Sequence, residues 1–158
     1  FRRAMFKEIA KPMSNKIASC LVLIDLDHFK QVNDRYGHVV GDEVLTKFGQ
    51  VVRQRIRKTD KFCRYGGEEF LLYLHDTTEE NANALLEDIK KSLESNKNWS
   101  ATDSTFSASF SAGVIQVKGE RNINKIIKAC DNLLYRAKST GRGKIETMSF
   151  PAYLNENI

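Results

Sequence analysis

The stretch that decides the fold runs from Lys61 to Leu74 and reads KFCRYGGEEFLLYL. Within it, two strand-like runs, 61–65 and 68–74, flank the pair Gly66-Gly67. Two glycines between such runs are a strong hairpin signal, because a tight turn needs residues with positive φ. We therefore predict a β-hairpin with two acidic residues, Glu68 and Glu69, directly after its turn.

Hydrophobic periodicity predicts the elements on either side of this hairpin. The apolar run Cys20–Asp25 is typical of a strand buried on both faces. Apolar residues at steps of one, three and four place a single stripe on each longer helix. The expected helices cover residues 2–10, 28–35, 41–58, 78–94 and 122–139, and the expected later strands cover residues 106–117 and 144–148. The helix over 28–35 ends at Gly37. The helix over 122–139 ends at Gly141, a residue suited to a helix stop.

The order of these elements is β-α-α-β-β-α-β-α-β. Removing one helix and the last strand leaves β-α-β-β-α-β, which is the ferredoxin-like pattern. We expect an α+β fold with a central, antiparallel-rich sheet and helices covering one face. The sequence contains no repeat, low-complexity segment or Pro-rich linker, which favours a single domain over residues 1–158.

Composition narrows the classes of protein that fit. The 158 residues are 41% hydrophobic and 28% charged, which is ordinary for a globular domain. The longest apolar run, Cys20–Ile24, is too short to cross a bilayer. The cysteines Cys20, Cys63 and Cys130 form no CxxC pair, and we interpret Cys20 and Cys130 as buried thiols in a reducing compartment. We therefore expect a cytoplasmic domain without membrane contact.

The net charge of +5 raises the question of nucleic-acid binding. However, lysines and arginines are scattered among acids along the whole chain, and no basic block stands out. A phosphate-rich small ligand accounts for the excess charge as well as DNA does. We expect no nucleic-acid partner.

Two acidic groups lie where the predicted strands end. Asp25-Leu26-Asp27 closes the buried strand, and Glu68-Glu69 follows the hairpin turn. In the expected topology these strands are neighbours, so acids from both can meet at one edge of the sheet. Divalent cations prefer carboxylate and backbone oxygens, and two ions bridging a phosphate can activate an attacking hydroxyl. The simpler alternative is that strand-end and turn acids are solvated.

At this point the sequence resembles a known family. Arg64-Tyr-Gly-Gly-Glu-Glu-Phe70 is similar to the signature of the GGDEF family, whose members are diguanylate cyclases. Four further segments resemble the family in order and at consistent spacing. These are Asp25–Lys30 with Asn33-Asp34, Tyr36–Asp42, Ser109–Val114, and Asp131–Arg142. The resemblance implies a palm-type nucleotidyl cyclase that condenses two GTP into cyclic di-GMP and two pyrophosphates.

The resemblance also implies roles for the acidic groups. Asp25, the backbone carbonyl of Leu26, and Glu68 would hold two divalent ions, Mg²⁺ or Mn²⁺, in each active site. Glu68 would also accept the proton of the attacking 3′-hydroxyl. Glu69 is counted among the catalytic residues without a defined step, and Lys30 is expected to stabilise charge in the transition state.

The substrate residues follow from the same resemblance. Asn33 and Asp42 would read guanine, whose N1–H and N2–H₂ groups can both donate to a carboxylate. The expected neighbours of the nucleotide are Phe29, His38 and Leu45 around the base, and Lys138 and Arg142 at the phosphates. Ordinary alternatives exist, since Gly41-Asp42 also suits a helix start and cations at the end of a helix pair with its dipole.

Arg57-Lys-Thr-Asp60 fits an RxxD pattern just before the hairpin. In the family, RxxD at this spacing is the inhibitory site for the product, so Arg57 and Asp60 are expected to bind cyclic di-GMP. The alternative is a solvated helix end in a basic cluster. Some members supply a further arginine from the following helix, where this chain has Asp88, with Lys90 or Lys91 as the nearest substitutes.

Two other functions compete with the cyclase. One is a catalytically silent module that binds GTP or cyclic di-GMP, although such relatives usually lose the acids that Asp25, Glu68 and Glu69 supply here. The other is a palm-type nucleotidyl transferase that acts on nucleic acid, for which a groove of basic and stacking residues is not evident. The cyclase needs two facing domains, so a homodimer is implied.

The family's opening Asp-x-Leu-Thr segment is absent from this sequence. We interpret the absence as an N-terminal truncation that removes part of the guanine pocket wall. A sensory region is expected upstream of the domain, and that region would hold any membrane anchor of the full-length protein.

Overall fold

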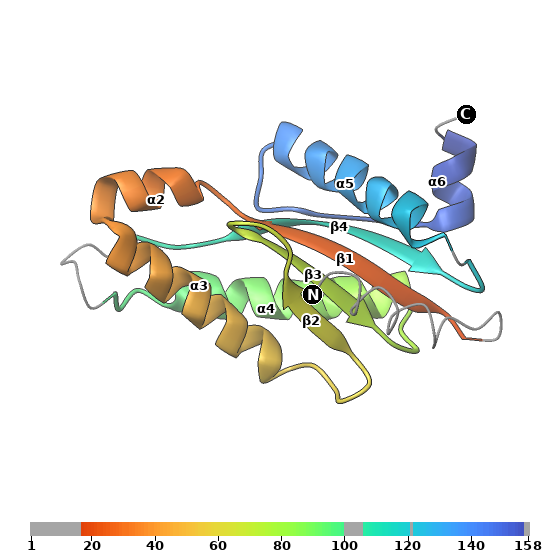
Figure 1. The fold of residues 1–158 in the computed structure, drawn as a ribbon, viewed down its shortest axis with the longest axis horizontal. Coiled ribbons are helices and arrows are strands. Elements are labelled where there is room, and N and C mark those ends of the chain that lie inside the picture. The colour runs from red at the N-terminus through yellow and green to blue at the C-terminus, as the bar shows by residue number, and fades with distance from the viewer. Residues whose placement is uncertain (1–16, 100–105, 121, 157–158) are drawn as a thin grey trace.

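The sheet has five strands in the order β2-β3-β1-β4-β5 (Figure 1). The computed structural model describes residues 17–99, 106–120 and 122–156. The central strand β1 (Ser19–Leu26) pairs antiparallel with β3 (Glu69–Leu74) and with β4 (Phe110–Val117). At the two edges, β2 (Lys61–Arg64) pairs antiparallel with β3, and β5 (Ile145–Ser149) pairs parallel with β4. The order β4-β1-β3-β2 confirms the ferredoxin-like core.

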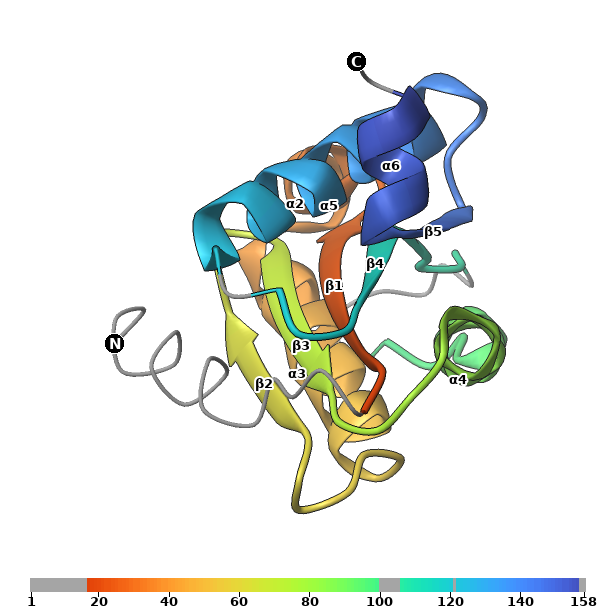
Figure 2. The same ribbon diagram turned by 90° about the vertical axis from the view of Figure 1, so that its right-hand side faces the viewer.

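Helices cover both faces of this sheet, so the expectation of one covered face is wrong. Alternate residues of β1 enter two separate clusters, with Val22 and Ile24 in one and Leu21 and Leu23 in the other. The first cluster includes α3 (His38–Arg53) and α4 (Glu79–Ser95), and the second includes α5 (Ile123–Ser139) and α6 (Phe150–Glu156). Figure 2 shows these two pairs of helices on opposite sides of the strands. The cause is visible in the sequence, because β1 is apolar on both of its faces.

Most predicted elements are confirmed, with shifted ends. The helix α2 (Phe29–Tyr36) ends at Gly37 as expected, but α3 begins three residues before Gly41 and ends five residues before Lys58. The strand β4 begins four residues after Phe106. The predicted helix over residues 2–10 lies outside the described residues. The helix α6 was not predicted, and its Phe150 and Tyr153 are buried in the second cluster.

The hairpin formed by β2 and β3 is confirmed, but the reason given for its glycines is wrong. Neither Gly66 nor Gly67 has a positive φ. The backbone N–H groups of Tyr65 and Gly66 both donate to the carbonyl of Glu69, at 2.7 and 3.1 Å, and this closes the turn. A methyl group added at Gly67 would meet no atom within 4 Å. The turn therefore leaves open space beside the two glutamates.

All three cysteines are buried and none is in a disulfide, which confirms the buried thiols predicted for Cys20 and Cys130. Burial is the main cause that raises the pKa of the Cys20 thiol to about 12. Among the described helices, none is both long and apolar enough to span a membrane.

Candidate active site

The two acidic groups predicted from the sequence do meet, at the edge of the sheet where β1 ends and β3 begins. In the pairing of β1 with β3, Asp25 lies directly opposite Glu69. One residue further, the backbone N–H of Leu26 donates to the carbonyl of Glu68 at 3.1 Å. The hairpin register therefore brings Glu68 and Glu69 beside the end of β1.

Asp25 is a buried carboxylate that is only partly satisfied. It is 7% exposed, and its Oδ2 accepts from the ammonium of Lys138, in the last turn of α5. Its Oδ1 is buried with no hydrogen-bond partner among the described residues. A buried anionic oxygen without a donor is costly, and a bound cation would remove that cost. This orphaned oxygen fits the metal-ligand role expected for Asp25.

Negative charge accumulates around the same point. Burial raises the pKa of the Glu69 carboxyl, the charge of Asp25 raises it further, and Lys138 acts in the opposite direction. Asp131 and Glu68 contribute smaller upward effects. Within the part of the chain that the structure describes, no group of three or more His, Cys, Asp or Glu side chains forms a ready metal cluster. The ligand set of Asp25, Glu68 and the Leu26 carbonyl therefore stays a prediction.

Asp27, the other acid at the end of β1, has different partners. Its Oδ1 accepts from the Ser111 hydroxyl at 2.7 Å, and its Oδ2 accepts from the Gly143 backbone N–H at 2.9 Å. Both carboxylate oxygens are thus bonded within the protein.

The residues expected to read guanine lie where α2 packs against α3. A Cβ added at Gly41 would lie 1.8 Å from the Asn33 Oδ1 and 3.4 Å from the Phe29 ring. Gly41 is therefore required for this close approach, a role that sequence reasoning missed. Asp42 is exposed inside α3, which begins at His38 after Gly37, so the helix-start alternative for Asp42 is wrong.

The remaining expected substrate residues surround this corner. Lys30 is exposed on α2, His38 is the exposed first residue of α3, and Leu45 is half-buried one turn after Asp42. Leu45 also lines an open pocket of about 410 Å³ between α3 and the hairpin, together with Phe62, Arg64 and Phe70. Sequence reasoning did not assign Arg64 a role. Its Nε donates to the Gly67 carbonyl at 2.9 Å and so holds the signature turn.

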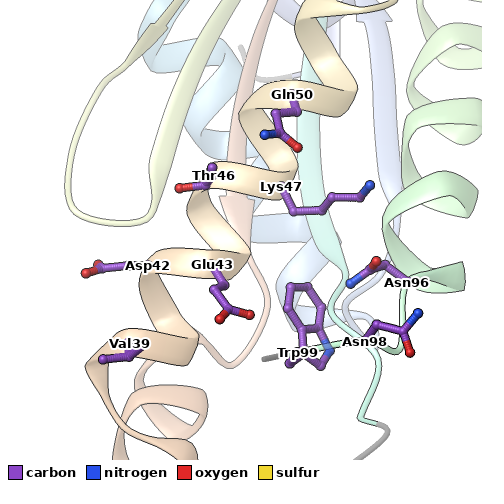
Figure 3. Close-up of a pocket in the computed structure, with 9 residues that line it drawn as sticks. All are labelled: Val39, Asp42, Glu43, Thr46, Lys47, Gln50, Asn96, Asn98 and Trp99. Atoms are coloured by element: carbon purple, nitrogen blue, oxygen red, sulfur yellow. The ribbon is translucent and has the colours of Figure 1, made fainter. Parts of the chain in front are cut away.

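A second pocket of about 440 Å³ lies between α3 and the segment after α4. Figure 3 shows Glu43 extending toward Trp99 and Lys47 extending toward α4, on the side of Asn96. Asp42 also lines this pocket, but its carboxylate points away from Trp99.

The expected phosphate residues come from the end of α5 and the turn that follows. Lys138 is bonded to Asp25. Arg142 is exposed, has a positive φ of 61°, and donates its backbone N–H to the Ala137 carbonyl at 3.0 Å. Gly141, with φ of 121°, follows the last helical residues as the predicted stop. The end of α5 and the turn after it therefore carry both expected phosphate residues, and the Lys138 ammonium reaches Asp25.

The RxxD residues lie away from this edge, in the loop before β2. The guanidinium of Arg57 contacts Asp60 at 3.3 Å, Thr77 Oγ1 at 2.9 Å and the His75 carbonyl. The Asp60 side chain is 2% exposed, and its oxygens also accept the backbone N–H groups of Arg57 and His75, at 2.8 and 2.9 Å. Arg57 remains 54% exposed, so a ligand at this loop would meet Arg57 and not Asp60.

The helix α4 beside this loop does not supply the expected substitute cation. Asp88 forms an ion pair with Arg55 at 2.7 Å. Lys90 donates to the Gly143 carbonyl at 2.7 Å and lies 3.6 Å from Glu87. Lys90 is thus engaged near the active-site edge, and only the exposed Lys91 remains of the two lysines considered.

Comparison with known proteins agrees with this geometry. The model of the GGDEF family, described as diguanylate cyclase, GGDEF domain, matches residues 1–144. The probable diguanylate cyclase DgcT of Escherichia coli K12 is 37% identical over 150 residues, which cover 91% of this chain and 33% of that protein. Diguanylate cyclase DosC of the same strain is 33% identical over 147 residues, covering 92% and 32%. The chain spans about a third of the length of these relatives.

Solved structures show the same fold. The active GGEEF domain of a diguanylate cyclase from Vibrio cholerae superposes with a TM-score of 0.81 at 30% identity, covering 91% of this chain and 92% of that one. The GGDEF domain of DgcB from Caulobacter crescentus, solved in complex with c-di-GMP, gives a TM-score of 0.84 at 26% identity, covering 92% and 86%. With its Gly66-Gly-Glu-Glu-Phe70 turn set beside Asp25 in this shared fold, the chain belongs to the GGDEF family of diguanylate cyclases.

Proposed function

We propose that this domain joins two GTP molecules into cyclic di-GMP and releases two pyrophosphates. The observation that carries the proposal is the buried Asp25 carboxylate beside Glu68 and Glu69, with one oxygen left without a donor. Lys138 compensates one oxygen of Asp25, and the other oxygen is left to a bound cation. Silent relatives usually lose the signature acids, whereas Asp25, Glu68 and Glu69 are all present here.

The reaction is a displacement at the α-phosphorus of GTP. The 3′-hydroxyl oxygen of one GTP forms a bond to the α-phosphorus of the other, and the bond from that phosphorus to the α–β bridging oxygen breaks. Pyrophosphate leaves with the bond's electrons, and Glu68 accepts the hydroxyl proton. A second, symmetric displacement closes the ring.

Side chains of this chain would bind and orient the reactants. Asp25, Glu68 and the Leu26 carbonyl would hold two ions, Mg²⁺ or Mn²⁺, which when bound supply charge neutralisation at the phosphates. Lys30, Lys138 and Arg142 would add positive charge around the same phosphates. Asn33 and Asp42 would accept the N1–H and N2–H₂ donors of guanine, with Phe29, His38 and Leu45 around the base.

The test is to incubate the protein with GTP and Mg²⁺ and to measure cyclic di-GMP by chromatography. Asp25→Asn and Glu68→Gln should each abolish synthesis, because each removes an anionic ligand without changing side-chain size. Asp76→Asn is the matched control, since Asp76 is exposed beyond the opposite end of β3. Near-normal synthesis by either active-site variant at saturating Mg²⁺ would contradict the metal assignment. A wild-type domain that binds GTP without making product would support the silent module.

We also propose that cyclic di-GMP inhibits the enzyme through Arg57. The exposed guanidinium can grip a phosphate or the Hoogsteen edge of guanine, while the buried Asp60 holds Arg57 in place. Initial rates are measured against added product for the wild type, for Arg57→Ala, and for a Lys58→Ala control. Arg57→Ala should relieve the inhibition while synthesis continues. Indistinguishable inhibition curves would show that the product acts elsewhere or not at all.

A further inference from the structure

The turn after α5 has an unusual backbone. Three consecutive residues, Gly141, Arg142 and Gly143, have positive φ, at 121°, 61° and 59°. Glycine adopts positive φ freely, whereas the Cβ of Arg142 makes a positive φ unfavourable at that position. A non-glycine residue stays in this region only when its surroundings fix it. The position of Arg142 therefore depends on the contacts of its neighbours.

Those contacts converge on Gly143. Its backbone N–H donates to the Asp27 Oδ2 at 2.9 Å and lies 3.1 Å from the Ser111 Oγ. Its carbonyl accepts from the Lys90 ammonium at 2.7 Å. The peptide groups on either side of Gly143 are thereby held between the end of β1, the strand β4 and the helix α4.

Asp27 is the charged centre of this arrangement. Ser111, which is fully buried, donates its hydroxyl to the Asp27 Oδ1 at 2.7 Å. Hydrogen bonds to an ionised carboxylate are about twice as strong as neutral ones. Ser111 is also the residue opposite Asp25 in the pairing of β1 with β4. The contacts that fix the turn thus border the candidate metal ligand directly.

We propose that Asp27 is a positioning residue whose carboxylate fixes Gly143 and so sets where Arg142 meets the phosphates of GTP. The inference rests on the proposed function, because it requires nucleotide phosphates at Arg142. By sequence alone, Asp27 belongs to the acidic group at the strand end and has no role of its own. The two Asp27 oxygens are bonded to Ser111 and Gly143.

The test is a double-mutant cycle between Asp27→Asn and Arg142→Ala. The readout is calorimetric binding of a GTP analogue with a methylene group between the α- and β-phosphates, in the presence of Mg²⁺. Each single variant should weaken binding by about tenfold, and the double variant should bind no more weakly than Arg142→Ala alone. The Mg²⁺ concentration that gives half-maximal synthesis should stay unchanged in Asp27→Asn.

Ser111→Ala provides a milder variant, which keeps the Asp27 charge and removes one of its bonds. Ser111→Ala should weaken analogue binding less than Asp27→Asn does, and it should cause no further loss when Arg142→Ala is already present. If Asp27→Asn does not fold, the cycle is measured with Ser111→Ala instead. Asp76→Asn is the control for the loss of an exposed acid. Multiplicative losses in the cycle, or a raised Mg²⁺ requirement in Asp27→Asn, would overturn the proposal.

The outcomes also separate this inference from the proposed function. A wild-type domain that neither binds the analogue nor makes cyclic di-GMP contradicts the cyclase itself. An active wild type whose Arg142→Ala variant binds the analogue normally contradicts the phosphate role of Arg142 and with it the positioning role of Asp27, and leaves the cyclase reaction standing.

Discussion

At the scale of residues, a glycine decides where the Asn33 amide, the proposed guanine reader, lies. Gly41 is buried in α3, and a Cβ there would fall 1.8 Å from Asn33 Oδ1 and 2.9 Å from Asn33 Cγ. The atoms in the way belong to the short side chain of Asn33, which cannot move aside as the end of a long, flexible side chain would. The close packing of α2 on α3 therefore holds Asn33 against Gly41, the residue before Asp42.

Gly41→Ala should displace Asn33 and reduce the preference for GTP over ATP. Adenine has no N1–H, so a carboxylate directed at that edge stays unpaired with ATP, a cost of about 1–3 kcal/mol that requires correct placement of the readers. Calorimetry with GTP and with ATP measures the preference. Gly49→Ala is the control on the same helix, since its Cβ would meet only the movable end of Arg53. An unchanged preference in Gly41→Ala would contradict the roles of Asn33 and Asp42.

The ion pair between Lys138 and Asp25 leads to a prediction about stability. Lys138→Met leaves the buried Asp25 carboxylate without its cation, and this should lower the free energy of unfolding by about 1–3 kcal/mol in EDTA. Urea denaturation measures the loss. Lys128→Met, at an exposed position on the same helix, is the control. If Lys138→Met is as stable as Lys128→Met, the pair does not compensate the charge of Asp25.

At the scale of elements, α5 links the second core to the active-site edge. It packs on β4 so closely that a Cβ at Gly113 would lie 2.2 Å from the Cys130 carbonyl oxygen and 2.6 Å from the Leu134 backbone nitrogen. Both obstacles are backbone atoms, which cannot move without moving the helix. Lys138 lies on α5 and Arg142 just after it. The packing of α5 against Gly113 therefore also sets the positions of these two residues.

Gly113→Ala should therefore destabilise the domain by about 1–3 kcal/mol and reduce synthesis in the fraction that stays folded. Gly49→Ala is again the matched substitution, because it adds the same methyl group inside a helix with only a flexible neighbour, and it should be neutral or stabilising. Chemical denaturation and initial rates of the two variants decide the matter. Equal stability would mean that α5 does not depend on the glycine at this position.

The same elements show how far sequence reasoning reaches. The hairpin, the β1 strand and the meeting of Asp25 with the Glu68-Glu69 pair were predictable, because the order of elements matches the ferredoxin-like pattern, in which the first strand and the hairpin are neighbours. The bond from Lys138 to Asp25 was not predictable, because 113 positions separate the two residues and only the packing of α5 on the sheet brings them together. Glycine weakens a strand interior, and nothing in the predicted strand 106–117 indicates that Gly113 is needed to admit the helix. The short helix α6 depends on tertiary contacts such as the 2.9 Å ion pair between Arg136 and Glu156.

At the scale of the whole molecule, the two-sided core places both expected thiols in apolar surroundings. Cys20 and Cys130 are both fully buried, one in each of the two clusters. Burial raises the pKa of Cys20 from 9.0 to about 12, and it raises the pKa of Cys130 as well. The folded chain therefore keeps these protons at pH values where the unfolded chain has lost them.

This difference makes stability depend on alkaline pH. Above about pH 8 the unfolded state binds fewer protons than the folded state, so the free energy of unfolding should fall as pH rises toward 12. Urea denaturation of the wild type and of a Cys20→Ala, Cys130→Ala double variant is compared at pH 7.5 and 10.5. The double variant should lose less stability between the two pH values. Equal losses would show that the thiols do not contribute.

The largest-scale prediction concerns the association of two domains. If each domain holds one GTP, the 3′-hydroxyl held by one domain must reach the α-phosphorus held by the other, and a two-fold arrangement satisfies both displacements. Specific activity should then rise with protein concentration until the domain is mostly dimeric. Fusing the domain to a parallel two-stranded coiled coil should remove this dependence, because the linker raises the effective concentration of the second domain. As a control, a fused Glu68→Gln variant should stay inactive, which separates association from chemistry. Constant specific activity across concentrations at which sedimentation finds only monomer would contradict the facing-domain mechanism and with it the homodimer.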